Sequence, residues 1–250
     1  MSIQLQIASD LHLECMTNIE YEKIIKPTAP ILVLAGDIGN LYNLNQLKDF
    51  IKWCCEQFVA VLYVPGNHEY YRQFNTPTLP FYKLNFQLKD LEKQFKNLYI
   101  LQRKLLEINN IYFAGCTLWS NFKQSPLPKY IVRIKGFNKY IYNNEHYKDL
   151  KFIKQVISKS QKEKKKLIII THHVPLYLTS CNHAKDNFNS LYFTNLEFLL
   201  EKKKIDTWIC GHIHSNFDFI HKNGTRVISN QKGKIKDKIT DYSPNCTISF

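Results

Sequence analysis

Five short blocks rich in Asp, Asn and His stand along the chain, each directly after an apolar run. In order they are Asp10-Leu11-His12, Gly36-Asp37, Gly66-Asn67-His68-Glu69, Thr171-His172-His173 and Gly211-His212-Ile213-His214. Carboxylate oxygens, amide oxygens and imidazole nitrogens are ligands for hard and borderline divalent metals. A pair of such ions needs about seven protein ligands and a bridging solvent molecule, which these blocks can supply. The residue types could therefore hold a pair of ions, and such a pair can make a bound water more acidic.

Spacing within the first and last blocks supports this interpretation. In Asp10-x-His12 and in His212-x-His214, alternation along an extended segment points both side chains to the same side, so two ligands reach one ion. Glycine comes directly before Asp37, Asn67 and His212. At each of these positions it lets the backbone turn without a Cβ clash.

The elements that must position these blocks are buried strands. Short apolar, β-branched runs predict strands over residues 3–8, 31–35, 59–64, 111–115, 167–171 and 207–210. Helical spacing of apolar residues between them predicts helices over 44–58, 152–157 and 191–200. This alternation indicates an α/β fold, in which ligands bind beyond the carboxyl ends of the strands.

The chain after residue 211 changes to strands without helices. We expect strands over 217–221, 225–229 and 247–250, with Asn223-Gly224 as a hairpin turn. The stretch 121–144 is the least regular and is interpreted as a long surface excursion. No linker rich in Pro, Gly or Ser divides the chain, so residues 1–250 are expected to form a single domain.

Composition limits the classes of partner. The formal charge is +13, yet only four of the 34 basic residues are arginines, which is poor support for specific nucleic-acid recognition. Apolar runs fall far short of the roughly 20 residues that span a bilayer, so no membrane partner is expected. Seven scattered cysteines without a C-x-x-C pair, and no signal-peptide pattern, favour reduced thiols in the cytoplasm.

The order of the five blocks resembles the calcineurin-like metallophosphoesterase superfamily, whose hallmark is D-x-H, G-D, G-N-H-D/E, H and G-H-x-H at successive strand ends. The resemblance spans residues 10–214, and segments 211–217 and 224–227 with Asn230 are similar to a bacterial-type, mostly uncharacterised branch. It implies a four-layer αββα sandwich of two mixed β-sheets flanked by helices.

The resemblance also implies a ligand set for two divalent or trivalent ions, either of which could be Mn, Fe, Zn, Ni or Co. The side chains implied for one ion are Asp10, His12, Asp37 and His214. Those implied for the other are Asp37, Asn67, His172 and His212. Asp37 would bridge the two ions and is for that reason also counted as catalytic.

The implied reaction is hydrolysis of a phosphomonoester or phosphodiester by a metal-bridging hydroxide. His68 would face the substrate and assist the leaving group, and Asn67 would also contact the substrate. Glu69 could orient or tune His68, or serve as a first-turn helix residue. His172 is favoured over its neighbour His173 as the metal ligand. His173 would then support a ligand without binding an ion, or face the substrate.

Several further residues are weighed for substrate binding. Arg72, one helical turn after His68-Glu69, and Lys232 are candidates for contacting phosphate. If residues 232–238 are extended, their four lysines share one face. The remaining histidines, His146, His183 and His221, are interpreted as ordinary surface or core residues. His183 follows the His172 strand closely enough in sequence that it could approach the cleft.

A small phosphoester is the favoured substrate. Protein Ser/Thr phosphatases of the superfamily carry an Arg soon after G-D, whereas Ile38, Gly39 and Asn40 follow here, which argues against a phosphoprotein. One alternative is a metal-dependent nuclease acting on single-stranded nucleic acid, given the basic chain. Another is a catalytically silent binding scaffold of the same fold, against which the intact ligand set argues.

Overall fold

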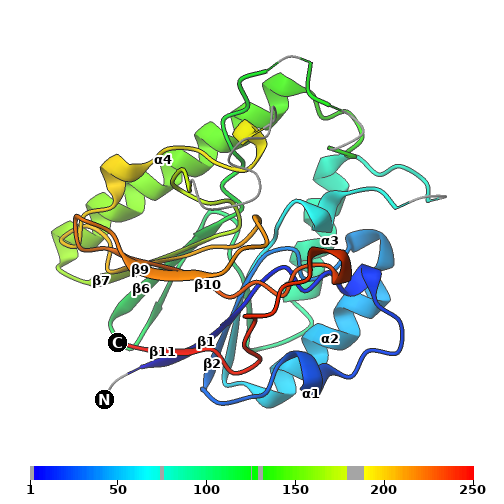
Figure 1. Cartoon of the computed structure of the whole chain (residues 1–250), viewed down its shortest axis with the longest axis horizontal. Coiled ribbons are helices and arrows are strands. Elements are labelled where there is room, and N and C mark those ends of the chain that lie inside the picture. The colour runs from blue at the N-terminus through cyan, green and yellow to red at the C-terminus, as the bar shows by residue number, and fades with distance from the viewer. Residues whose placement is uncertain (1–2, 74–75, 125, 129–131, 179–188) are drawn as a thin grey trace.

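The computed structural model describes residues 3–73, 76–124, 126–128, 132–178 and 189–250 and contains two β-sheets packed face to face between helices (Figure 1). The strand order in the first sheet is β11-β1-β2-β3-β4. Its strands are β1 (Gln4–Ala8), β2 (Ile31–Ala35), β3 (Ala60–Val64), β4 (Leu98–Ile100) and β11 (Thr247–Ser249). Neighbours β1 to β4 run parallel, while β11 is antiparallel to β1, so the sheet is mixed.

The second sheet has the order β5-β6-β7-β8-β10-β9. Its strands are β5 (Lys104–Ile108), β6 (Ile111–Cys116), β7 (Lys166–Thr171), β8 (Thr207–Ile209), β9 (Phe217–Ile220) and β10 (Arg226–Ser229). The four central strands are parallel, and both edge strands, β5 and β9, are antiparallel to their neighbours. This sheet is also mixed.

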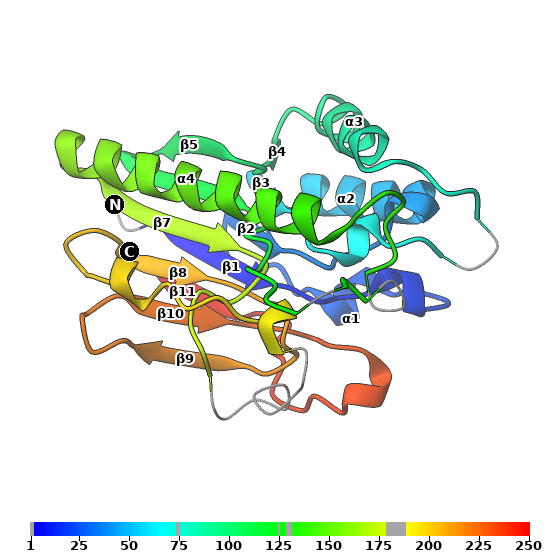
Figure 2. The same ribbon diagram turned by 90° about the horizontal axis from the view of Figure 1, so that it is seen from above.

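Helices cover the two outer faces (Figure 2). The first sheet carries α2 (Leu44–Gln57) and α3 (Phe81–Glu92), with the short α1 (Tyr21–Ile24) beside them, and the second carries α4 (Lys139–Glu163). No helix in the described part of the chain combines the length and apolar character needed to cross a bilayer.

Alternation along the strands builds the four layers. In β2, Leu32 and Leu34 pack in a cluster with α2 and α3, whereas Val33 joins a cluster shared with the second sheet. In β7, Ile169 packs against α4 and Ile168 faces the first sheet. Because side chains of successive strand residues point to opposite faces, each central strand supplies two cores. The predicted αββα sandwich of two mixed sheets is confirmed.

The predicted strands are confirmed within one or two residues at their ends, and so is the hairpin. Gly224, with a φ of +92°, lies in the turn between β9 and β10 and donates its N–H to the His221 carbonyl at 2.7 Å. The sequence did not predict β4, which has only three residues, or β5, an edge strand whose residues are half-buried or exposed. Neither shows the buried apolar run that marked the central strands.

Two predictions are wrong, and the first concerns residues 191–200. The expected helix over 191–200 is instead two 3₁₀ turns, η4 (Asn189–Leu191) and η5 (Glu197–Leu199). Asn195 Oδ1 accepts the Glu197 N–H at 3.0 Å, and such local side-chain acceptors compete with helix hydrogen bonds.

The stretch 121–144 is not a surface excursion in its described residues. Phe122, Val132 and Phe137 are at most 5% exposed and belong to the core cluster of α2 and α3. The sequence pattern missed this because the buried residues are irregularly spaced. From Asn138, whose side chain accepts the Ile141 N–H, the stretch continues into α4.

A buried ionic cluster joins α4 to the turn before β5 and leads to a pH prediction. Arg103 Nη1 donates to Asp149 Oδ1 at 2.6 Å and to Glu145 Oε2 at 3.0 Å. Burial raises the pKa of Asp149 to about 6 from an ordinary 3.8. The folded chain therefore keeps this proton over a range in which the unfolded chain releases it, so stability falls as pH rises from about 4 to 6.

We expect Asp149→Asn to remove that fall, because the amide does not titrate. The free energy of unfolding of the wild type relative to the variant should drop by about 2–3 kcal/mol between pH 4 and pH 7. Urea unfolding of both proteins at several pH values, with a chelator present, measures the difference. Two profiles that stay parallel would contradict the prediction.

Candidate metal centre

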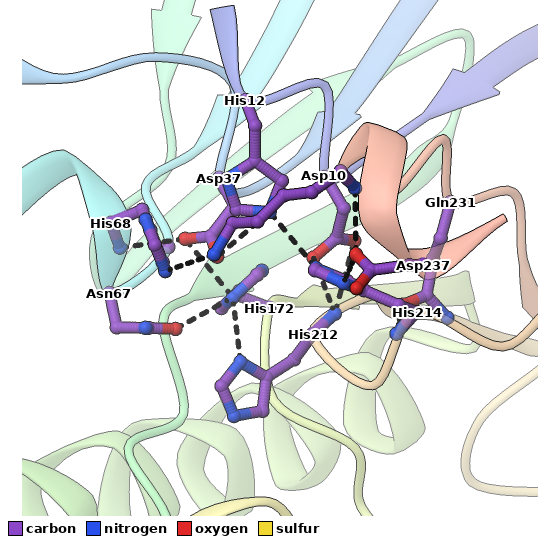
Figure 3. A network of polar contacts seen from close by, with 12 residues as sticks. Asp10, His12, Asp37, Asn67, His68, His172, His212, His214, Gln231 and Asp237 are labelled. Carbon is purple, nitrogen blue, oxygen red and sulfur yellow. Dashed lines mark hydrogen bonds and ion pairs between the residues drawn. The ribbon is translucent and has the colours of Figure 1, made fainter. Parts of the chain in front are cut away.

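The five sequence blocks meet at the carboxyl ends of β1, β2, β3, β7 and β8 (Figure 3). Seven side chains, those predicted as metal ligands, converge there from the two sheets: Asp10, His12, Asp37, Asn67, His172, His212 and His214. The first five of these are at most 3% exposed, and the last two are half-buried. The predicted convergence of the blocks thus appears in the structure.

One group of donor atoms gathers around Asp10, His12 and His214. The Nε2 atoms of His12 and His214 lie 2.9 Å apart, and His214 Nε2 lies 3.4 Å from Asp10 Oδ1. Asp37 Oδ2 is 3.9 Å from His12 Nε2. All these atoms point into one space, an arrangement that fits a cation bound by nitrogen and oxygen ligands.

A second group gathers around His172. Its Nε2 atom lies 2.9 Å from Asn67 Oδ1, 3.1 Å from His212 Nδ1 and 3.3 Å from Asp37 Oδ1. Asp37 therefore directs one carboxylate oxygen to each group. A carboxylate in this position fits a bridging ligand between two ions.

The outward-facing ring nitrogens are fixed by acceptors. His172 Nδ1 lies 3.0 Å from the Ala35 carbonyl, His12 Nδ1 lies 3.1 Å from Glu14 Oε1, and His214 Nδ1 lies 2.5 Å from Asp237 Oδ2. When each outer nitrogen donates its hydrogen, the inner Nε2 keeps a lone pair directed at the cluster. Imidazoles that bind metals are held in this way, so the donor set and its supports both fit metal ions.

Backbone strain is concentrated in the same residues. Asp10, His12, Asp37, His212 and His214 all have φ between 49° and 78°, in the left-handed region. That region is unfavourable for residues with a Cβ, and such conformations persist where the surrounding structure enforces them, often at functional sites. The left-handed turns also explain how residues directly after strands aim their side chains inward, which an extended continuation would not do at every position.

Glycines permit the close approach of the blocks. A Cβ on Gly36, whose φ is +89°, would lie 2.3 Å from His172 Nδ1. One on Gly66 would lie 2.2 Å from Asp37 Oδ1. Any side chain at either position would displace a predicted ligand, so the structure explains why glycine precedes Asp37 and Asn67.

Glu69 supports the backbone of the site and does not contact the His68 ring. Its buried carboxylate accepts the N–H groups of Asp37 at 3.1 Å, Ile38 at 2.8 Å and Gly66 at 2.8 Å, and the Tyr63 hydroxyl at 2.7 Å. The expectation that Glu69 orients His68 finds no contact in the structure.

We expect Glu69→Gln to loosen the metal site, because the amide NH₂ would face donors that now have an acceptor. Each buried donor left without an acceptor costs about 1–3 kcal/mol, and metal affinity should fall by about 10–100-fold. Thermal unfolding in chelator and metal titration measure the two effects, with the exposed Glu163→Gln as the control. Unchanged metal affinity in a correctly folded variant would contradict this role.

Glu14 makes the contact that sequence reasoning assigned to Glu69. Its Oε1 atom lies 3.1 Å from His12 Nδ1 and 3.1 Å from His68 Nδ1. Burial favours the neutral acid, but the hydrogen bonds to the two imidazoles prevail and lower the pKa of Glu14 to about 2. Glu14 is therefore an ionised acceptor for both rings. The alternation Asp10-x-His12-x-Glu14 was the available signal, and it was missed.

A cavity of about 370 Å³ opens beside the cluster. Among its lining residues are Asp37, Asn67 and His68. His68 keeps its side chain 16% exposed and donates its backbone N–H to Asp37 Oδ1 at 2.7 Å. His68 therefore lies at the boundary between the ligand cluster and the open cavity.

The two basic candidates from the sequence do not line this cavity. Lys232 is half-buried outside it, and Arg72 lines a neighbouring cavity, where its Nε donates to the Thr76 carbonyl at 3.0 Å. Residues 232–238 are not extended, because Ile235–Asp237 form a 3₁₀ turn, η6. Lys234 and Lys236 line the cavity instead.

The other histidines divide as expected between site and scaffold. His173 lines the cavity with its ring 4.0 Å from that of His212, and burial lowers its pKa to about 3, so it is neutral. His146 is buried against the Trp119 carbonyl and His221 lies after β9, both away from the cluster. His183 lies outside the described residues.

Comparisons with known proteins agree with this geometry. A model of the calcineurin-like phosphoesterase family matches residues 6–216. An uncharacterized protein of Acanthamoeba polyphaga mimivirus is 30% identical over 273 residues, covering 98% of this chain and 96% of the relative.

Solved structures share the fold at low sequence identity. A phosphopantetheinyl hydrolase from Mycobacterium tuberculosis superimposes with a TM-score of 0.76 and 12% identity over 99% of this chain and 96% of that one. A dimetal phosphatase from Danio rerio superimposes with a TM-score of 0.56 and 14% sequence identity, and the match covers 99% of this chain and 91% of that one.

Proposed function

The chain belongs to the calcineurin-like phosphoesterase family, and on this premise we propose that it is a two-metal hydrolase of a small phosphomonoester or phosphodiester. Residues 1–250 would act as one domain. The observation that carries the proposal is the position of Asp37, which directs Oδ1 to the His172 group and Oδ2 to the His12 group. One carboxylate between two sets of donors is what a pair of ions requires.

In this proposal the ligands divide as the two groups of donor atoms do. Asp10, His12 and His214 would hold one ion, and Asn67, His172 and His212 the other, with Asp37 shared. The ions would supply charge neutralisation for the phosphate oxygens and a water made more acidic. The chain's part is to hold the ligands at fixed positions before substrate arrives.

His68 would supply the proton for the leaving oxygen. Its Nδ1 lies 3.1 Å from Glu14 Oε1, and its Nε2 lies on the cavity side, next to Lys234. A histidine held by a carboxylate and facing the substrate is suited to general acid catalysis. His68 and Asp37 would accordingly be the catalytic residues, and Asn67 would contact the substrate as well as an ion.

Hydrolysis of p-nitrophenyl phosphate and of its bis ester tests the proposal. Enzyme stripped with chelator should be inactive and should recover activity when Mn²⁺, Fe²⁺, Zn²⁺, Ni²⁺ or Co²⁺ is added. The ratio between the two substrates distinguishes a monoesterase from a diesterase. If none of these ions gives turnover of either substrate by well-folded protein, the proposal fails.

A nuclease remains the second candidate because Arg133, Lys234 and Lys236 line the cavity. Cleavage of a single-stranded oligonucleotide that weakens steeply with salt would favour it, since phosphate contacts release counterions. A cavity of about 370 Å³ fits a small ligand better than a polymer, so we place the small phosphoester first.

A further inference from the structure

Cationic side chains gather on the His68 side of the cavity. Lys234 Nζ lies 3.2 Å from His68 Nε2. The His68 ring lies 4.9 Å from the Tyr71 ring, and the Arg133 guanidinium lies 5.8 Å from the centre of that same Tyr71 ring. Lys234 therefore contacts His68 directly, and Arg133 reaches it through the Tyr71 ring.

Three cations share one region, because Arg133, Lys234 and Lys236 all line the first cavity. Burial and the Glu14 charge raise the pKa of the Cys15 thiol, whereas Lys234, Lys236 and Arg133 act in the opposite direction. Coulomb interactions weaken with distance and with solvent screening, so three cations that line one cavity form a local cluster of positive charge.

The carboxylates of the cavity face the ligand cluster or the backbone. Asp237 Oδ2 accepts from His214 Nδ1 at 2.5 Å and from the Lys234 N–H at 2.8 Å. Asp37 lies between the two groups of ligands. The reacting phosphate would meet the metal ions, and the cations on the His68 side are placed to meet another part of the substrate.

A second cavity continues beyond Arg133. It measures about 590 Å³ and shares Arg133 with the first cavity, and Arg72 and Lys135 also line it. The cationic lining therefore continues from the first cavity into the second. A ligand larger than a single phosphate ester has room there.

From this arrangement, and resting on the proposed function, we infer that the substrate's leaving group carries a second anionic group, a phosphate or a carboxylate, which binds Arg133 and Lys234. The guanidinium of Arg133 presents paired donors suited to either oxyanion, and the ammonium of Lys234 adds a point charge. These two side chains would select substrates that carry two anionic groups over substrates that carry one.

Matched substrate pairs test the inference in two arms. Fructose 1,6-bisphosphate against fructose 6-phosphate probes a second phosphate, and 3-phosphoglycerate against glycerol 3-phosphate probes a carboxylate. In at least one arm, the bis-anion should bind the metal-loaded protein about tenfold or more tightly, because hydrogen bonds between charged groups are the stronger kind. Calorimetry gives the affinities, and phosphate release gives kcat/KM.

Variants then assign the preference to its residues. Arg133→Gln and Lys234→Gln should each reduce the ratio of the two affinities at least threefold, whereas the exposed Lys222→Gln, in the β9–β10 turn, should preserve it. The ratio within one variant is independent of the fraction folded. Lys234, a half-buried residue directly before η6, provides the result if the Arg133 variant does not fold.

The outcomes separate this inference from the proposed function. Equal wild-type affinities in both arms, or a preference that survives both variants, would overturn the inference even if p-nitrophenyl phosphate is hydrolysed. A preference lost in the variants of a protein that hydrolyses nothing would support the anion site and reject the phosphoesterase.

Discussion

Asp37→Asn is expected to lower kcat/KM for p-nitrophenyl phosphate by about 10³-fold or more and to leave at most one ion bound per chain. The amide keeps the shape of the side chain and an oxygen for the His68 N–H, so the loop is preserved. It loses the charge and the second oxygen, and with them the ability to bridge. Steady-state kinetics and elemental analysis of the purified variant measure both effects.

Asp149→Asn is the matched control for this change. Asp149 is equally buried but lies on α4 in the Arg103 cluster, so its variant should retain ions and turnover at neutral pH. A melting temperature of Asp37→Asn in chelator close to that of the wild type would show that the fold is intact. An Asp37→Asn variant that keeps both ions and full activity would refute the bridging position.

His68→Ala is expected to reduce kcat by about 10²–10⁴-fold while both ions stay bound. His68 would donate a proton and is not assigned as a ligand, so its loss should remove chemistry without removing metal. The effect should be smallest for p-nitrophenyl phosphate, whose leaving group needs little protonation, and larger for an alkyl phosphate. Comparing kcat for the two substrates, with metal content measured on the same samples, tests the role.

The His68 prediction has a clear contrary result, because His68 Nδ1 shares Glu14 with His12 and lies near Asp37. If His68→Ala loses an ion, His68 is itself a ligand or is needed to hold one. His173→Ala is the comparison at a second cavity histidine, and a fall in kcat that does not depend on the leaving group is expected there. Equal dependence on the leaving group in both variants would contradict a special role for His68.

The sequence predicted the fold wherever local pattern and tertiary environment agree. The runs at β2 and β7 are apolar at almost every position because both faces are covered, and that pattern is visible without a structure. The pattern failed at residues 191–200, where a polar side chain takes backbone hydrogen bonds, and at β5, which lies on an edge. At β5, neighbours distant in sequence decide the conformation, whereas at residues 191–200 the competing hydrogen bond is a local one.

The site was predictable to the extent that its chemistry resides in contiguous blocks. Asp10 and Asp37 follow neighbouring central strands of one sheet, and His172 follows a central strand of the sheet packed against it, so the fold brings their strand ends together. The basic side chain beside His68 was not predictable in the same way. The turn η6 directs Lys234 to the cavity and leaves Lys232 outside it, and an extended segment would have placed both on one face.

We expect two ions to bind at the shared Asp37 carboxylate, and elemental analysis of reconstituted protein is the direct test. Protein stripped with chelator, loaded with one kind of metal and freed of excess should contain about two ions per chain, with p-nitrophenyl phosphate hydrolysis rising as the second ion binds. Full activity in metal-free protein, or full loading at a single ion per chain, would contradict the claim.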